Sequence, residues 1–128
     1  MANIIVVDSD HDNISFIGGL LKKLGHRVEV LSGASELMLT LRTKQPELIV
    51  IGISLGDGDG RELSKTLQAE MLYRDIPVIL TSPFYHSERE IKSFCCDELV
   101  AVPIDSSAMT ACLQQLLAKE EARLLRIS

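Results

Sequence analysis

The sequence predicts an α/β fold: a doubly wound, five-stranded parallel sheet with helices on both faces. Short apolar runs alternate with segments in which apolar residues recur every three or four positions. The runs, such as 4–7 and 48–53, are apolar at consecutive positions, which is typical of parallel strands covered by helices on both sides. The chain has 128 residues, 46% of them hydrophobic, so it is long enough for one core of this kind.

Each predicted strand is followed by a predicted helix. Strands are expected at 4–7, 28–31, 48–53, 76–81 and 98–102. The first helix is expected at 13–24, where Gly25 stops it, and the second carries its apolar stripe from Ala34 to Leu41. The later helices have apolar stripes at Leu63, Leu67 and Met71, and at Met109, Cys112, Leu113, Leu116 and Leu117. Five strand–helix units result.

Several helix starts carry capping residues. Ser87 and Glu90 have the spacing of a capping box, which predicts a short fourth helix. Asp10 or Asp12 is expected to cap the first helix, and Asp105 or Ser106 the last.

Composition excludes several classes of function. The chain has 13 basic and 18 acidic residues, a net charge of −5, which argues against nucleic-acid binding by bulk charge. No apolar run approaches the ~20 residues of a membrane span, and no signal peptide is recognised, so the expected compartment is the cytoplasm. The three cysteines, Cys95, Cys96 and Cys112, lack the spacing of a zinc site and are expected to be reduced.

Ligands of doubly wound sheets bind outside the carboxyl ends of the strands. The segments expected at this edge are 8–12, 52–60, 81–86 and 102–105. The function of the chain is therefore expected to lie in these four loops.

Four stretches together resemble the receiver domain of two-component response regulators, a flavodoxin-like fold. They are NIIVVDSD, QPELIVIGISLGDGDGREL, DIPVILTS and DELVAVPID, and the resemblance covers essentially residues 3–118. We therefore expect a receiver-like domain at 1–118, and at 119–128 an extension of the last helix or a tail.

The resemblance implies phosphoryl transfer from a histidine kinase to an Asp at the end of the third strand, with Mg²⁺ held by acids after the first. This chain has Gly52 at the acceptor position. Asp8 is retained, but the second acid position is Ser9, with Asp10 beside it. The strand-four hydroxyl is retained as Thr81, and the strand-five Lys is replaced by Val102. The aromatic switch position of the family is Leu99.

Glycine has no carboxylate, so no acyl phosphate can form at Gly52. We interpret the chain as a degenerate receiver, or pseudo-receiver, with a non-enzymatic role in two-component or phosphorelay signalling. It is expected to act through contact with a protein, such as a kinase, an effector or a second copy, and independently of phosphorylation.

Two alternatives remain open. In the first, the chain is a phosphorelay receiver with a nonstandard acceptor such as Asp57, and Asp8 and Asp10 form a weak Mg²⁺ site. In the second, it is a flavodoxin-like domain that binds a small ligand, a corrinoid or a nucleotide. The corrinoid motifs fail on spacing, because Asp10 directly precedes His11 and Ser54 directly precedes Leu55, and no G-x-G-x-x-G follows the first strand.

The resemblance places signal output on the face of the fourth helix, fifth strand and fifth helix. Phe84 and Tyr85 follow the fourth strand there, and aromatic side chains dominate interface energetics, so we predict a contact surface that includes Phe84, Tyr85 and Leu99. His11 and His86 are assigned no role, and the stretch from Gly56 to Gly60 is interpreted as a flexible, unfilled loop.

Overall fold

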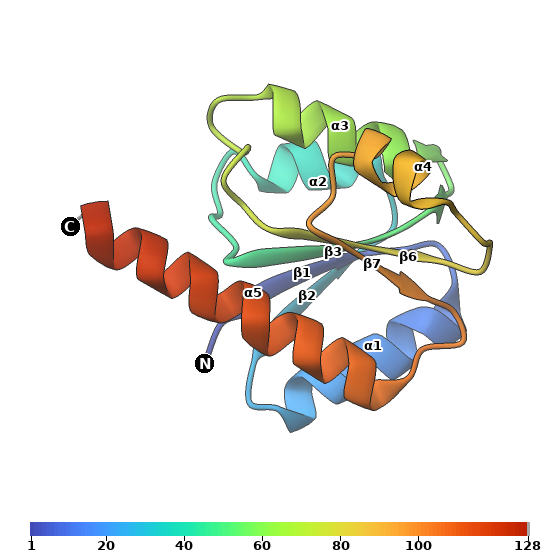
Figure 1. Ribbon diagram of the computed structural model, residues 1–128, viewed down its shortest axis with the longest axis horizontal. Helices are drawn as coiled ribbons and strands as arrows, with labels where there is room; N and C mark the ends of the chain where they lie inside the picture. The colour runs from blue at the N-terminus through green and yellow to red at the C-terminus, as the bar shows by residue number, and fades with distance from the viewer. Residues whose placement is uncertain (128) are drawn as a thin grey trace.

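The computed structural model describes residues 1–127 and shows the predicted five-stranded parallel sheet (Figure 1). Its strand order is β2-β1-β3-β6-β7, so β3 is the central strand. The strands are β1 (Asn3–Val7), β2 (Arg27–Leu31), β3 (Leu48–Gly52), β6 (Val78–Ser82) and β7 (Glu98–Ala101). All neighbouring strands in this sheet run parallel, so the predicted fold class is confirmed.

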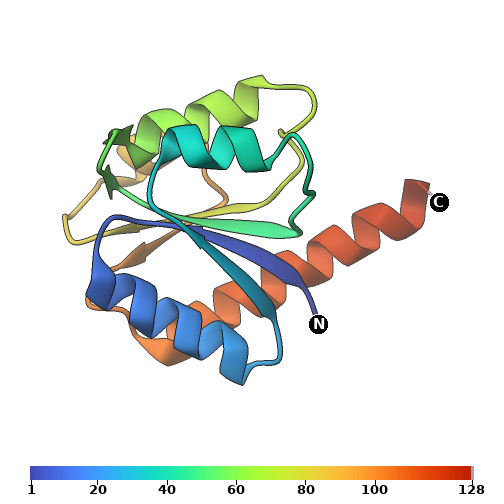
Figure 2. The same ribbon diagram turned by 180° about the vertical axis from the view of Figure 1, so that it is seen from behind.

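Helices cover both faces of the sheet (Figures 1 and 2). On one face lie α2 (Ala34–Thr40), α3 (Gly60–Ala69) and α4 (Glu88–Ser93), and on the other lie α1 (His11–Lys23) and α5 (Ser106–Ile127). Each face has its own apolar cluster because successive side chains of a strand point to opposite sides. In β1, for example, Ile5 packs with the α2 and α3 side and Ile4 with the α1 and α5 side.

The predicted helix caps form as side-chain hydrogen bonds. Asp10 caps α1 by accepting from the backbone N–H of Asn13 at 3.0 Å. Ser87 and Glu90 make the capping box of α4. Asp105 accepts from the backbone N–H of Ser107 at 2.8 Å at the start of α5. These side chains replace the partners that backbone N–H groups lack in the first turn of a helix.

Two predictions about the ends of the third helix and third strand are wrong. Met71 was predicted on a buried stripe, but α3 ends at Ala69 and Met71 is 78% exposed. The stretch after β3 is also not the predicted flexible loop, because β4 (Ser54–Leu55) and β5 (Gly58–Asp59) pair as a small antiparallel hairpin. Leu55 is buried and anchors this hairpin to the core.

The last helix is long. It continues without a break to Ile127, so residues 119–127 belong to the same helix as the core-packing residues Met109, Leu113 and Leu116; residue 128 lies outside the described residues. Its C-terminal part extends beyond the sheet (Figure 2). No helix of residues 1–127 is both long and apolar enough to cross a bilayer.

Candidate functional site

The carboxyl ends of the three central strands bring Asp8, Gly52 and Thr81 together. Asp8 directly follows β1, Gly52 ends β3, and Thr81 lies in β6 opposite Gly52 in the strand register. This is the edge at which doubly wound sheets hold their ligands. The parallel register therefore assembles three of the six residues predicted for the phosphorylation pocket.

The Asp8 carboxylate occupies the space in which a side chain at position 52 would begin. A Cβ atom added to Gly52 would lie 2.5 Å from both Cγ and Oδ2 of Asp8. Asp8 is only 3% exposed, so its carboxylate has little room to move away. A side chain at position 52 would require the Asp8 carboxylate to shift from this position.

The environment of Asp8 is only partly polar. Its Oδ1 accepts a hydrogen bond from the backbone N–H of Asp10 at 3.0 Å, and its Oδ2 accepts a long one, 3.5 Å, from the side chain of Asn13. Burial raises the pKa of the Asp8 carboxyl above its ordinary value, against the opposing effect of these hydrogen bonds. The ionised carboxylate is therefore held in the fold at a cost in stability.

The remaining acids and hydroxyls do not form a metal site around Asp8. The Ser9 hydroxyl donates to the backbone carbonyl of Ser54 at 2.8 Å, which ties the first loop to the β4–β5 hairpin. The Asp10 side chain is committed to the cap of α1. Within residues 1–127, no group of three or more His, Cys, Asp or Glu side chains could hold a metal ion. The residues present therefore do not fit the Mg²⁺ that the family resemblance implies.

The opposite side of the site offers no charge to a phosphoryl group. Thr81 is buried, and its Oγ1 has no hydrogen-bond partner among the described residues. Val102 is half-buried and its backbone N–H donates to the carbonyl of Ser82, while its side chain is aliphatic. The position where the family has a lysine thus carries no charged side chain.

Asp57 is engaged elsewhere. Its carboxylate accepts hydrogen bonds from the backbone N–H groups of Ala34, at 2.8 Å, and Ser35, at 3.0 Å, and so caps α2 from outside that helix. These N–H groups lower the pKa of the Asp57 carboxyl below its ordinary value. A Cβ atom at Gly33 would lie 2.5 Å from Asp57 Oδ1, so this cap also depends on a glycine.

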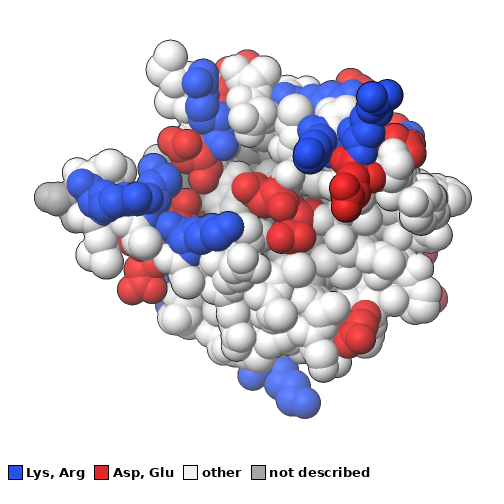
Figure 3. Space-filling model, in the orientation of Figure 1, with Lys and Arg blue, Asp and Glu red and all other residues white. Residues whose placement is uncertain are grey.

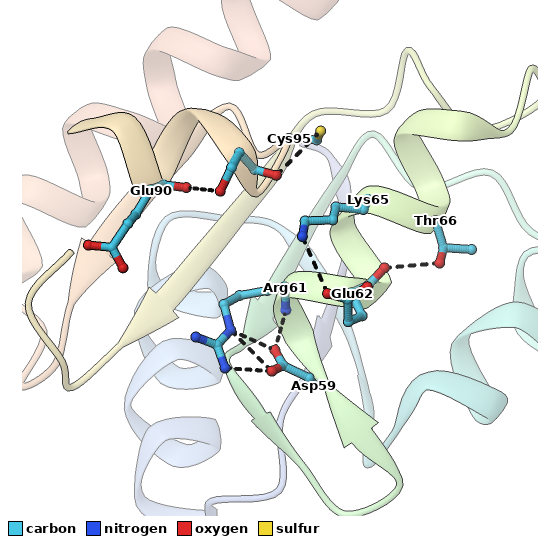
Figure 4. Close-up of polar contacts among 8 residues, drawn as sticks. Asp59, Arg61, Glu62, Lys65, Thr66, Glu90 and Cys95 are labelled. Atoms are coloured by element: carbon cyan, nitrogen blue, oxygen red, sulfur yellow. Dashed lines mark hydrogen bonds and ion pairs between the residues drawn. The ribbon is translucent and has the colours of Figure 1, made fainter. Parts of the chain in front are cut away.

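The second loop acid, Asp59, opens α3, as its sequence position suggests. It accepts from the backbone N–H of Arg61 at 2.8 Å and pairs with the Arg61 guanidinium at 2.6 Å (Figure 4). The Arg61 side chain lowers the pKa of the Asp59 carboxyl. Gly60 follows with its N–H bonded to the carbonyl of Ile53, and a Cβ atom there would lie 2.1 Å from the carbonyl oxygen of Gly52. The turn after the acceptor position is therefore closely packed.

A hollow of about 410 Å³ lies beside Asp8, between the start of α1 and the start of α2. Three of its lining residues, Asp8, Glu36 and Asp57, carry carboxylates, and its lining includes no Lys or Arg. Such a wall repels phosphate and gives no support to a nucleotide ligand.

On the face seen in Figure 3, acidic and basic side chains lie beside one another and form no continuous basic surface.

The predicted contact residues differ in exposure. Phe84 is 61% exposed and Tyr85 is 89% exposed, in the loop between β6 and α4. Leu99 is half-buried and packs against the apolar cluster under α2, α3 and α4. The aromatic pair is thus accessible to a partner, whereas Leu99 contributes mainly to the core.

The cysteines take no part in the site. All three are free, and burial raises the pKa of the Cys96 thiol to about 11, which keeps it protonated at neutral pH. Sequence reasoning missed a different pair, Ser82 and His86, whose side chains meet at 2.8 Å. Their spacing of four residues across a strand end is the one local signal that could have indicated this contact.

Comparison with known proteins identifies the family. A family model described as response regulator receiver domain matches residues 4–99, so the chain belongs to the receiver domain family of two-component signalling. The polar-differentiation response regulator DivK of Brucella ovis is 28% identical over 105 residues, which cover 80% of this chain and 85% of DivK. The aerobic respiration control sensor protein ArcB of Escherichia coli is 24% identical over 115 residues, covering 88% of this chain. The chain spans only 15% of the length of ArcB.

Solved structures share the fold at low sequence identity. The signal receiver domain of an HD domain-containing protein from Pseudomonas fluorescens superposes with a TM-score of 0.85 at 19% identity, over 97% of this chain and 92% of that one. The receiver domain of the sensor histidine kinase PA1611 from Pseudomonas aeruginosa gives 0.81 at 18% identity, over 91% and 98% of the two chains. These structures support the fold alone.

The buried Asp8 leads to a prediction on stability. Its pKa is raised in the folded state, so its favourable contribution is full below the ordinary value of 3.8 and is lost as pH rises through the folded value. Asp8→Asn should therefore be more stable than the wild type at neutral pH, with the difference shrinking as the pH falls toward 3.8. Urea unfolding at a series of pH values checks this. Asp12→Asn, at an exposed position, is the charge-loss control, and a destabilised Asp8→Asn at neutral pH would contradict the argument.

The cap on α2 leads to a second prediction. Asp57→Ala should lower the melting temperature, and Asp57→Asn should lower it less, because an amide oxygen still accepts one N–H. Since the pKa of Asp57 is lowered on folding, its contribution is present above the ordinary value and is lost as pH falls through the folded one. Thermal unfolding at neutral and acidic pH measures both effects. Glu121→Gln controls for the loss of one exposed carboxylate, and equal melting of Asp57→Ala and wild type would exclude the cap.

Proposed function

We propose that this receiver domain is a pseudo-receiver that acts by protein contact and independently of phosphorylation. One observation carries the proposal: the Asp8 carboxylate fills the space above Gly52, where a phosphoacceptor would stand. Glycine at position 52 provides no nucleophile, and the Asp8 carboxylate occupies the space in which one would lie. The domain is accordingly a signalling module without catalytic chemistry of its own.

Phosphoryl transfer to a carboxylate needs a nucleophile, neutralisation of charge by a metal, and fixed donors for the transferred group. Gly52 supplies no nucleophile. The Ser9 hydroxyl donates to a backbone carbonyl, and the Asp10 side chain caps α1. Asp8 is therefore the one carboxylate of residues 8–10 left to bind a metal. Val102 supplies no cation, and Thr81 alone remains as a donor. Two of these three requirements are thus missing, and Thr81 meets the third only in part.

Asp57 is a poor replacement for the lost acceptor. A nucleophilic carboxylate must have an oxygen free to approach phosphorus in line, with the metal already in place. Both oxygens of Asp57 accept N–H groups from the start of α2, Oδ1 from Ala34 and Oδ2 from Ser35. Attack from this position would first require the loss of the α2 cap.

The exposed aromatic pair is the proposed contact surface. Phe84 and Tyr85 lie in the loop before α4, and large exposed aromatic side chains are common anchors of protein interfaces. Receiver domains interact with histidine kinases in two-component systems, and the chain resembles part of the sensor protein ArcB. We propose a histidine kinase, another signalling protein or a second copy of this chain as the partner, with no nucleic acid and no membrane insertion involved.

The proposal predicts that small phosphodonors leave the protein unmodified. After incubation with acetyl phosphate and Mg²⁺, the intact mass should be unchanged, because no carboxylate is available at position 52. A receiver domain that has the acceptor Asp serves as the positive control. Intact-mass spectrometry is run on the wild type, Asp57→Asn and Asp8→Asn in parallel.

The variants identify the residue if an adduct does form. A phosphoryl adduct that is lost in Asp57→Asn would show a receiver with a nonstandard acceptor. An adduct lost in Asp8→Asn would show that the buried carboxylate itself reacts. Either result would overturn phosphorylation independence, and the spectrum of the positive control makes a negative result meaningful.

The contact surface predicts a loss of association. The double variant Phe84→Ala with Tyr85→Ala should weaken binding by at least about tenfold, since truncation of aromatic anchors at an interface commonly costs this much. Binding is measured by fluorescence anisotropy of the labelled chain against the kinases and receivers of the same genome, and self-association by sedimentation velocity. Leu39→Ala, which truncates an exposed side chain of α2, is the control. Unchanged association of the double variant would place the surface elsewhere.

A further inference from the structure

A buried polar contact closes the loop that carries the aromatic pair. Ser82, at the end of β6, is fully buried, and its Oγ lies 2.8 Å from Nε2 of His86. The side chain of His86 is itself only 5% exposed. The two residues stand on either side of Phe84 and Tyr85, so their contact joins the two ends of the exposed segment.

The Ser82 hydroxyl takes part in two hydrogen bonds. The backbone N–H of Phe84 donates to Ser82 Oγ at 3.0 Å, so that oxygen already accepts one hydrogen bond. Among the described residues, His86 Nε2 lies within hydrogen-bond distance of the same hydroxyl. Ser82 Oγ either donates to Nε2 or accepts from Nε2–H through its second lone pair, according to the tautomer of His86, and in both cases the two side chains are hydrogen-bonded.

The rest of the imidazole is also held. Nδ1 lies 3.9 Å from Oε2 of Glu90, whose other oxygen accepts from the N–H of Ser87 in the capping box. The ring of His86 meets the ring of the buried Phe94 edge-on, with centroids 5.1 Å apart and planes at 87°. His86 thus contacts Ser82 at the end of β6, lies near Glu90 in the first turn of α4, and packs on Phe94 directly after α4.

These contacts leave Phe84 and Tyr85 pointing into solvent. The segment between Ser82 and His86 is closed by one side-chain hydrogen bond and by the Phe84 N–H on the same hydroxyl. Its aromatic side chains remain 61% and 89% exposed, although such residues normally bury most of their surface. A loop ordered before binding loses less conformational entropy when a partner docks.

We propose that His86 is a positioning residue: its hydrogen bond with Ser82 holds the loop between β6 and α4 in the shape that presents Phe84 and Tyr85 to a protein partner. The significance for binding rests on the contact surface proposed above. The ordering of the loop does not, because it can be measured on the protein alone.

Two substitutions of His86 separate its hydrogen bond from its bulk. The side-chain amide of His86→Gln can place an oxygen near the position of Nε2 and accept from Ser82, whereas His86→Asn is too short to reach. Ser82→Ala removes the hydroxyl from the other side. His11→Asn, at the exposed start of α1, is the matched control for the loss of an imidazole.

Amide hydrogen exchange and ¹⁵N spectra of the imidazole test the loop without a partner. In the wild type, ¹⁵N shifts of His86 report which imidazole nitrogen carries the hydrogen, and so which group donates in the contact with Ser82. The amide of Phe84 should exchange about tenfold faster in His86→Asn and Ser82→Ala, since a hydrogen bond of ordinary strength is lost, while those of β1 and β3 stay protected. His86→Gln and His11→Asn should exchange as the wild type does. Unchanged exchange in both His86→Asn and Ser82→Ala would overturn the proposal.

Association measurements on the same variants keep the two proposals apart. If the Phe84 and Tyr85 double variant binds more weakly and His86→Asn does too, with His86→Gln restoring binding, both proposals are supported. If the double variant weakens binding and His86→Asn does not, the positioning role of His86 is wrong and the contact surface stands. If the double variant binds normally, the contact surface is wrong, and the exchange data still decide whether the hydrogen bond orders the loop.

Discussion

The carboxylate of Asp8 stands against the backbone of Gly52, and the rest of the functional edge is arranged around that contact. A buried carboxylate is costly unless hydrogen bonds compensate it, and Asp8 receives one bond of ordinary length and one long one. The structure retains this group at a position where a glycine gives it space. In a receiver with an acceptor, two carboxylates would meet here and a cation would offset their repulsion. In this chain a single carboxylate fills the space, and the demand for a cation falls with it.

The loops around this contact are tied down by other residues. Ser9 bonds the β4–β5 hairpin, Asp57 caps α2, and Gly60 lets the start of α3 approach the carbonyl of Gly52. Each tie uses a group that would otherwise be available to a ligand. The polar side chains of this edge therefore hold neighbouring loops together.

The surface beside this edge is exposed and aromatic, whereas the edge itself is buried and polar. The segment between Ser82 and His86 keeps two large aromatic side chains in solvent, and the contacts that hold it are buried and local to β6 and α4. Under the proposed function, a fixed aromatic loop would offer one conformation to a partner. Switching by phosphorylation would need a loop that changes its contacts, whereas recognition of a constant surface is strengthened by a loop that does not.

The sequence by itself determined the fold class, the helix caps and the loss of the acceptor. Apolar periodicity reports which face of a segment is buried, and capping residues act within one turn, so Asp10 and the Ser87–Glu90 box could be predicted from neighbours in the chain. The absence of a carboxylate at position 52 could be recognised from the place of Gly52 at the end of a predicted strand. Only the tertiary structure decided that Asp8 fills the space above Gly52, that Asp57 caps α2, and that Gly56 to Gly60 belong to a packed hairpin rather than an open loop. These contacts join segments far apart in the chain, and their geometry follows from strand order and register, which set the approach of side chains that no local pattern encodes.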